Sequence, residues 1–329
     1  MNIKEKEQRM AHKRGHKIMA VKGEFKALGL LLMMAVFLSL IPSSGQAAVA
    51  LPDVQQLQGI TMSSSTLWSP GRLTVGGDGT LYVVDSYKDH IVKFDASGSY
   101  AGDIPFPGVS AMAVGPDGAL YVGSHKDYSV SIIRNGQVAG FLGGGKNEFR
   151  TIKDIACDPA TGVVYVVDNV GNAVRMFDAA GRDLGTLGGL NLPLAIEVTT
   201  DAVYVIDAPV VPDNASMTTA SRISIFDKTS YNLMGTIDDY GKGQMFRPTD
   251  LAVAGDIIYV SDAASQGVLL FDTLGVYLGE IKSISGELKT AVSLAISSDG
   301  TLYVSSNDTH SIKMFSITAG GTGQQGGQK

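Results

Sequence analysis

Asp250-Leu-Ala-Val-Ala-Gly-Asp-Ile-Ile-Tyr-Val-Ser-Asp262 is the stretch that decides the fold. An apolar segment leads through a Gly-containing turn into a second apolar segment that carries the dipeptide Tyr-Val. The Tyr-Val segment occurs six times, and its tyrosines are 39, 44, 39, 55 and 44 residues apart. These tyrosines are Tyr82, Tyr121, Tyr165, Tyr204, Tyr259 and Tyr303. A repeat of this length with only strand patterns is typical of β-propeller blades.

Each repeat continues as a loop, a third apolar strand, a second turn and a fourth strand, as in Val268-Leu-Leu-Phe-Asp272 and the residues after it. In the sixth repeat, the strand pattern ends at Ile317, which leaves the repeat with three strands. Its fourth strand must therefore come from another part of the chain. Residues 54–60 precede the first repeat and alternate apolar with polar side chains. We therefore predict an all-β, six-bladed β-propeller whose ring is closed by this N-terminal strand in the last blade.

The chain divides by composition into three parts. Residues 1–26 are polar and basic, residues 27–41 are apolar, and small residues follow. This order predicts that residues 1–47 are a cleaved signal peptide or an uncleaved N-terminal anchor, the anchor being the one route to a membrane. Residues 48–318 are predicted to form the propeller, and the Gly- and Gln-rich residues 319–329 a flexible tail. The protein is therefore expected to be exported to the periplasm, the exterior or the cell surface.

Charge and cysteine content restrict the class of protein further. Residues 1–47 hold 8 of the 26 basic and 3 of the 32 acidic side chains, so the remainder carries 18 basic and 29 acidic ones. A net charge of about −11 repels phosphates, and we expect no nucleic-acid partner. The single cysteine, Cys157, rules out an intrachain disulfide and a Cys-x-x-Cys-His haem attachment site.

The repeats resemble the NHL family of propellers. The best match is Gly241-Lys-Gly-Gln-Met-Phe246-Arg-Pro248-Thr-Asp250-Leu-Ala-Val253, which runs on to Tyr259-Val-Ser-Asp262. The stretch Asp85-Ser-Tyr-Lys-Asp89-His90-Ile91 is similar to the turn for which that family is named. The resemblance covers residues 69–317 and implies a six-bladed propeller, whereas it says little about activity.

The resemblance also implies which side chains face the mouth of the central channel, because in NHL propellers this is the residue before the inner-strand Ile-Ala-Val. These positions carry Arg72, Ala111, Asp154, Ala195, Asp250 and Ser293. The polar members Arg72, Asp154, Asp250 and Ser293 are candidates for binding a small ligand or a cation. The alternative is a solvated rim in which the aspartates order their own loops. Asp154 and Asp250 belong to blades 3 and 5, so we expect them across the mouth from each other.

The loop between the second and third strands of blade 4 is longer than its counterparts. It spans residues 208–221, which is an insertion of roughly ten residues, and it is expected on the same face as the channel mouth. Loops on rigid scaffolds often carry binding residues. The candidates here are Val210, Val211, Met217 and Arg222, and the alternative is a tolerated insertion.

Catalytic patterns are missing from the sequence. It contains no Gly-x-Ser-x-Gly, phosphate-loop or His-Glu-x-x-His motif. His90, His125 and His310 occupy different positions of their loops, so no metal site is predicted from them. We assign no catalytic residue, and the sequence favours a protein that is not an enzyme.

The function expected from the sequence is that of an exported, non-catalytic NHL-type propeller, acting as a protein-interaction scaffold or a ligand-binding module of the cell envelope. Its partner would be an envelope or extracellular protein. Resemblance to exported bacterial NHL proteins encoded beside multihaem cytochromes adds a multihaem cytochrome to the candidates. The alternative is a metal-dependent propeller lyase or lactonase-type enzyme with its site at the channel mouth. A single divalent cation belongs to that alternative, and no other cofactor is expected.

Overall fold

The computed structural model describes a single region of the protein, with short gaps. The described residues are 49–61, 69–207, 221–241, 247–282, 288, 291–306 and 309–318. The chain divides into two units, residues 1–48 and residues 49–329, and every described residue lies in the second. The predicted leader (1–47), most of the blade-4 loop (208–220) and the predicted tail (319–329) lie outside the described residues. The described part of the chain contains no helix that is long and apolar enough to cross a membrane.

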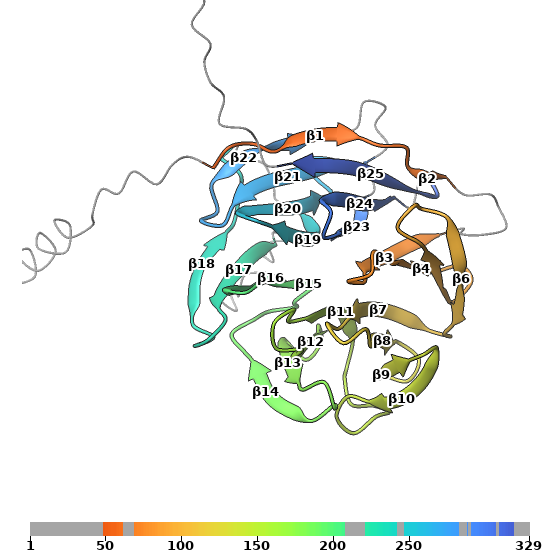
Figure 1. Cartoon of the computed structure of the whole chain (residues 1–329). Helices are drawn as coiled ribbons and strands as arrows, with labels where there is room; N and C mark the ends of the chain where they lie inside the picture. The colour runs from red at the N-terminus through yellow and green to blue at the C-terminus, as the bar shows by residue number, and fades with distance from the viewer. Residues whose placement is uncertain are drawn as a thin grey trace, which may run out of the picture. The chain divides into compact units, whose positions relative to one another are not determined.

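The described strands form six antiparallel sheets arranged around a central channel, which is the six-bladed β-propeller that the repeat predicts (Figure 1). Blades 1 to 5 each consist of four strands that follow one another in the sequence. Blade 1 contains β3 (Pro70–Val75), β4 (Leu81–Asp85), β5 (His90–Phe94) and β6 (Tyr100–Pro105). Blade 2 contains β7 (Val109–Val114), β8 (Leu120–Ser124), β9 (Ser129–Arg134) and β10 (Gln137–Phe141). Blade 3 contains β11 (Ile152–Cys157), β12 (Val164–Asp168), β13 (Ala173–Phe177) and β14 (Asp183–Leu187).

The second half of the ring repeats this order. Blade 4 contains β15 (Ala195–Val198), β16 (Ala202–Asp207), β17 (Arg222–Asp227) and β18 (Leu233–Ile237). Blade 5 contains β19 (Pro248–Ala254), β20 (Ile257–Asp262), β21 (Gly267–Asp272) and β22 (Tyr277–Ile281). Blade 6 contains β23 (Ala291–Ile296), β24 (Thr301–Ser306) and β25 (Ser311–Thr318), together with two strands from the N-terminal end of the described region, β1 (Asp53–Gln56) and β2 (Ile60–Thr61).

The two N-terminal strands complete the last blade. β1 pairs antiparallel with β25, with Val54 opposite Ile317, and β2 pairs with the other end of β25, with Ile60 opposite Ile312. Figure 1 shows the orange β1 lying along the dark blue β25. The prediction that residues 54–60 close the ring is confirmed. The closing strand covers the edge of β25, which would otherwise present unpaired backbone groups.

The Tyr-Val strands are the second strands of their blades, and they are buried on both faces. Every residue of β8, β12, β16, β20 and β24 is buried, because each of these strands lies between two neighbouring blades. The outermost strands are largely exposed, as in β10. Six apolar clusters of buried side chains fill the six interfaces between adjacent blades. The Asp-Gly turns expected from the sequence are present, and Gly79, Gly118 and Gly300 adopt the positive φ that such turns favour.

Candidate functional site

The innermost strands of the six blades surround the channel, and two corresponding positions on these strands define two rings of residues. The mouth ring is the set expected from the sequence, namely Arg72, Ala111, Asp154, Ala195, Asp250 and Ser293. Two residues further along each strand is the residue that pairs with the repeat tyrosine, and we call this set the channel ring. The channel ring consists of Thr74, Ala113, Ala156, Glu197, Ala252 and Ala295.

A local irregularity accompanies the mouth ring in five of the six inner strands, whereas β15 of blade 4 pairs regularly with β16. The pairing register of β11 shifts between Ile152 and Asp154, and that of β19 shifts between Pro248 and Asp250. β3, β7 and β23 shift in register at the corresponding place. Such bulges change the direction of the strand and re-aim a side chain. In these five blades, the mouth-ring residue therefore lies at a break in the ladder rather than in a regular strand.

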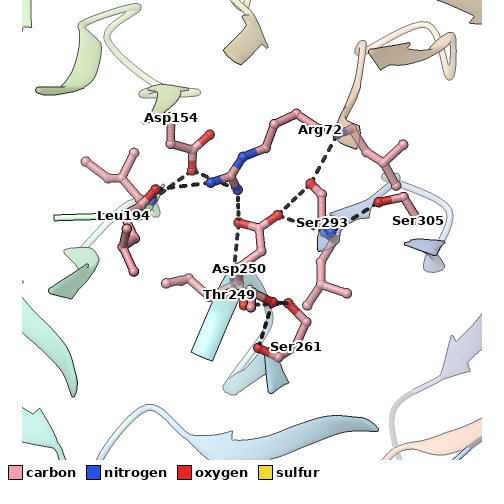
Figure 2. A network of polar contacts seen from close by, with 12 residues as sticks. Arg72, Asp154, Leu194, Thr249, Asp250, Ser261, Ser293 and Ser305 are labelled. Atoms are coloured by element: carbon pink, nitrogen blue, oxygen red, sulfur yellow. Dashed lines mark hydrogen bonds and ion pairs between the residues drawn. The ribbon is translucent and has the colours of Figure 1, made fainter. Parts of the chain in front are cut away.

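Arg72 crosses the centre of the ring from blade 1 (Figure 2). Its Nη1 lies 2.8 Å from Oδ1 of Asp250 in blade 5 and 3.6 Å from Oδ2 of Asp154 in blade 3. Its Nη2 donates a hydrogen bond of 3.1 Å to the backbone oxygen of Leu194, at the start of blade 4. One guanidinium thus joins four blades. The two aspartates come from blades 3 and 5, which are separated by one blade, and a single nitrogen of Arg72 brings both of them into one cluster.

The polar mouth-ring side chains also hold neighbouring blades together. Oδ2 of Asp154 accepts a hydrogen bond from the backbone N–H of Ile196 in blade 4 (3.0 Å). Oδ2 of Asp250 accepts one from the backbone N–H of Leu294 in blade 6 (2.8 Å). In both cases, the donor comes from the inner strand of the next blade. These bonds satisfy backbone groups that are buried between blades.

Ser293 makes the corresponding link across the closure of the ring. Its Oγ accepts a hydrogen bond from the backbone N–H of Leu73 in blade 1 (3.1 Å) and donates one to Oδ2 of Asp250. Oγ of Ser305 accepts a hydrogen bond from the backbone N–H of Ser293 (3.1 Å) and donates one to the backbone oxygen of Gly71 (2.7 Å). Serine hydroxyls of blade 6 therefore link it to the inner strand of blade 1.

Burial controls the electrostatics of this cluster. Burial lowers the pKa of the Arg72 guanidinium, but the charges of Asp154 and Asp250 outweigh this effect and hold the pKa above its ordinary value. Burial raises the pKa of Asp154 to about 7 against the opposing effect of Arg72, and the charge of Asp250 adds to the rise. The cluster is thus an ion pair between Arg72 and Asp250, with Asp154 as a second acid that titrates near neutral pH.

The four polar mouth-ring candidates are therefore brought together, although not on a solvated rim. Asp154, Asp250 and Ser293 are buried, and the Arg72 side chain is 15% exposed. Their polar atoms contact one another and the backbone of the next blade. No group of three or more His, Cys, Asp or Glu side chains within the described ranges is arranged to hold a metal ion.

A cavity of about 170 Å³ occupies the channel next to this cluster. Asp154 and Asp250 lie at its wall, and all six channel-ring residues line it. Four of the channel-ring residues are alanine, whereas blade 1 contributes Thr74 and blade 4 contributes Glu197. Because blades 1 and 4 are opposite in a six-bladed ring, a hydroxyl and a carboxyl group line opposite sides of the channel.

Glu197 is the functional candidate that the sequence argument missed. It is half-buried, and no hydrogen bond or ion pair links it to any residue that the structure describes. Burial raises the pKa of its carboxyl group to about 8, and the charges of Asp250 and Asp154 add to this rise. The available signal was the alignment of the inner strands, in which Glu197 stands where four other blades have alanine.

Only one blade-4 loop candidate, Arg222, is described, because Val210, Val211 and Met217 lie within residues 208–220. Nε and Nη2 of Arg222 bind the two carboxylate oxygens of Asp207 at 3.1 and 3.2 Å. Oγ of Ser224 donates a further hydrogen bond to Asp207, which is fully buried. Asp207 ends β16 and Arg222 begins β17, so this pair fastens together the two ends of the loop. The guanidinium group of Arg222 thus binds Asp207 at the base of the loop.

Comparison with known proteins identifies the fold. No model of a known protein family matches the sequence, and no curated protein matches it. A gluconolactonase from Xanthomonas campestris superimposes with a TM-score of 0.62 at 14% identity, covering 84% of this chain and 93% of that one. A streptogramin B lyase gives 0.57 at 10% identity, with 80% and 98% covered, and hydrazine synthase from Kuenenia stuttgartiensis gives 0.56 at 14% identity, with 79% and 99% covered. At these identities, the likeness shows that the chain has the architecture of six-bladed β-propellers.

Proposed function

We propose that this protein is an exported, non-catalytic propeller that binds another protein of the cell envelope or the exterior. The observation that carries this proposal is the engagement of the mouth-ring carboxylates. Asp154 and Asp250 are held by Arg72 and by backbone N–H groups of the next blade. These are the acids that a catalytic site at the channel mouth would require. Their contacts favour a role in holding the ring together.

The blade-4 loop is the part of the molecule through which we propose that the partner binds. The Arg222–Asp207 pair joins the two ends of residues 208–221 on a buried base. A loop presented by a rigid scaffold loses less conformational freedom when it binds. Val210, Val211 and Met217 supply apolar side chains within the loop. A multihaem cytochrome is one candidate partner, which rests on the resemblance to exported NHL proteins.

The proposed interaction is tested by site-specific photo-crosslinking in producing cells. A photoreactive residue replaces Ala215 in the loop, and a matched control replaces Thr229, an exposed residue in the turn at the opposite end of β17. We expect a discrete protein adduct at position 215 that is absent at position 229, and we expect Arg222→Ala to weaken it because the base of the loop is released. The same adducts at both positions, or none at position 215, contradict the proposal.

The second candidate function is that of a metal-dependent lyase or lactonase. It is favoured because two of the similar structures are a streptogramin B lyase and a gluconolactonase. In that case, a divalent cation would bind Asp154 and Asp250 after Arg72 had moved away. The test is the metal content of the purified full chain by mass spectrometry before and after chelation, together with lactone hydrolysis in the presence of Ca²⁺ or Zn²⁺. We expect no stoichiometric metal and no turnover. A bound equivalent that disappears when Asp154 and Asp250 are changed to Ala would support the enzyme instead.

A further inference from the structure

The channel cavity contains one carboxyl group without a partner. Glu197 lines the cavity and makes no hydrogen bond or ion pair with the described residues. The hydroxyl group of Thr74, on the opposite side of the channel, likewise makes no hydrogen bond within the described part of the chain. Both side chains are half-buried, and polar groups that are taken partly out of water are normally satisfied by protein, water or a ligand. Two polar groups that face one small cavity therefore point to an occupant of that cavity.

The charge balance of the channel favours a cationic occupant. Three carboxyl groups, from Asp154, Glu197 and Asp250, lie at the wall of the cavity. The guanidinium of Arg72 is within ion-pair distance of both aspartates, and none of its hydrogen bonds or ion pairs among the described residues involves Glu197. An ionised carboxylate in a poorly solvated site is costly unless a positive charge accompanies it. Glu197 is thus the acid in the channel that lacks a counter-charge.

The shape and lining of the cavity favour an organic cation rather than a metal ion. Alanines form most of the channel ring, and the half-buried Val75, Val114 and Val253 line the cavity further along the inner strands. Ca²⁺ needs about six to eight oxygen ligands, which one free carboxyl and one hydroxyl group do not supply. A volume of about 170 Å³ is close to that of a cavity that holds one benzene molecule. The cavity therefore fits a molecule of about six non-hydrogen atoms with one charged and one apolar end.

We propose that the channel cavity is a binding site for a small primary alkylammonium ion, with its ammonium group on Glu197 and its alkyl chain against the alanines of the channel ring. The Thr74 hydroxyl oxygen accepts a second ammonium hydrogen bond from the opposite side. The Arg72 cluster spans one end of the cavity, so the ligand enters from the other end of the channel. This proposal does not depend on a protein partner at the blade-4 loop, and either one can fail without the other.

The test is a calorimetric titration of the purified full chain with n-butylammonium chloride at about pH 9, where both the amine and Glu197 carry their charges. n-Butanol, which has the same size and no charge, is the matched ligand control. The decisive variant is Glu197→Gln. Asp256→Asn, which removes an exposed carboxylate from the turn between β19 and β20, is the matched protein control. Ala156→Val fills part of the cavity and leaves Glu197 in place.

We expect one equivalent of n-butylammonium to bind the wild-type chain and the Asp256→Asn variant with the same affinity. Glu197→Gln should weaken binding at least tenfold, Ala156→Val should weaken it several-fold, and n-butanol should not bind. Absence of saturable binding to the wild-type chain, equal binding of butanol, or unchanged affinity in a folded Glu197→Gln variant would overturn the proposal. Binding of Ca²⁺ in competition with the amine would overturn it as well.

The pH dependence of the affinity is a second readout. The titratable groups that line the cavity with Glu197 are Asp154 and Cys157 on β11 and Asp250 on β19, whereas β7 and β23 contribute none to the lining. Arg72 on β3 contacts both aspartates. The affinity should rise about tenfold per pH unit below the pKa of Glu197 and fall as the amine loses its proton near pH 10. An affinity that does not change between about pH 6 and pH 9 would contradict the assignment of the ammonium group to Glu197.

Discussion

Arg72 is the residue that converts two separated acids into one cluster. A buried carboxylate without a counter-charge is strongly unfavourable, and Asp250 is buried with a guanidinium nitrogen 2.8 Å away. Asp154 is farther from the same nitrogen, at 3.6 Å, and it keeps a pKa of about 7 because burial outweighs the attraction of Arg72. The contribution of Arg72 to stability should therefore depend on the charge of both acids.

Arg72→Met tests this dependence. Removal of one partner from a buried ion pair usually costs about 3–5 kcal/mol, because the remaining charge stays buried. We expect a loss of this size in the free energy of unfolding at about pH 8, and a smaller loss at about pH 5, where Asp154 is protonated. The measurement is denaturant unfolding at the two pH values. Arg182→Met, which breaks an exposed pair with Asp178, should cost less than about 1 kcal/mol, and an equal cost for both variants would contradict the prediction.

The negative charge of Glu197 should destabilise the folded protein to an extent that depends on pH, and Glu197→Gln removes this charge. The pKa of Glu197 is raised to about 8 in the folded state, against an ordinary value near 4.3 for the unfolded chain. Between these values the folded state binds more protons, so the free energy of unfolding falls as the pH rises, by at most about 1.4 kcal/mol per pH unit. The variant should therefore match the wild type near pH 5 and exceed it in stability near pH 8.5. Urea unfolding at both pH values measures this, and a difference that does not change with pH would refute it.

At the scale of the element, the inner strands and the closing strand have separate tasks. Five of the six inner strands carry a break in register at the mouth ring, and the side chains of Asp154 and Asp250 reach the backbone of the next blade. β1 instead supplies four residues of antiparallel pairing along β25. Three of its four residues are exposed, so its contribution comes mainly from the backbone ladder. The position of β1 at the edge of blade 6 makes it a protection against pairing with another chain.

Replacing Asp53–Gln56 by Gly-Ser-Gly-Ser should weaken this closure. At about 1 kcal/mol per ladder hydrogen bond, the free energy of unfolding should fall by about 2–4 kcal/mol. The exposed edge of β25 should also promote self-association, which light scattering after size-exclusion chromatography detects as a concentration-dependent mass. Deletion of residues 319–329 is the matched control, and we expect neither effect from it. A monomeric replacement variant with the unfolding midpoint of the wild type would show that β1 does not stabilise the ring.

At the scale of the whole molecule, the apolar core is divided among the interfaces between blades. One cluster joins blades 4 and 5, and another joins blade 6 to blade 1 and includes Ile312 and Leu73. Every blade thus packs against two neighbouring blades. This includes blades 6 and 1, which meet where the ring closes. A closed ring has no terminal repeat, so loss of packing at one interface weakens the support for both blades beside it.

Two matched core variants test whether the ring unfolds as one unit. Ile312→Ala lies at the interface between blades 6 and 1, and Ile223→Ala lies at the interface between blades 4 and 5. Both side chains are fully buried. Each should cost about 2–5 kcal/mol and shift a single unfolding transition. Far-ultraviolet and near-ultraviolet circular dichroism should report the same midpoint in each variant. Two transitions, with each variant moving a different one, would show that the blades unfold independently.

Much of the architecture was accessible from local patterns. The Tyr-Val repeat predicted six blades, and the missing fourth strand after Ile317 predicted closure by residues 54–60. The alignment of the inner strands put Arg72, Asp154, Asp250 and Ser293 at corresponding positions, and in the structure their side chains form one connected cluster. It did not predict that Arg72 holds both aspartates, because that contact depends on how far one flexible side chain reaches across the channel. Glu197 was overlooked because its significance comes from the alanines around it.

The sequence by itself determined the number of blades, the order of strands within each blade and the way in which the ring closes. These properties follow from hydrophobic periodicity, turn residues and the pairing needs of strand edges, all of which are local in the chain. Only the tertiary structure decided which mouth-ring groups neutralise one another and which acid is left facing the cavity. The physical reason is that Arg72, Asp154, Glu197 and Asp250 come from four different blades, so their distances and pKa values exist only once the ring has closed around the channel.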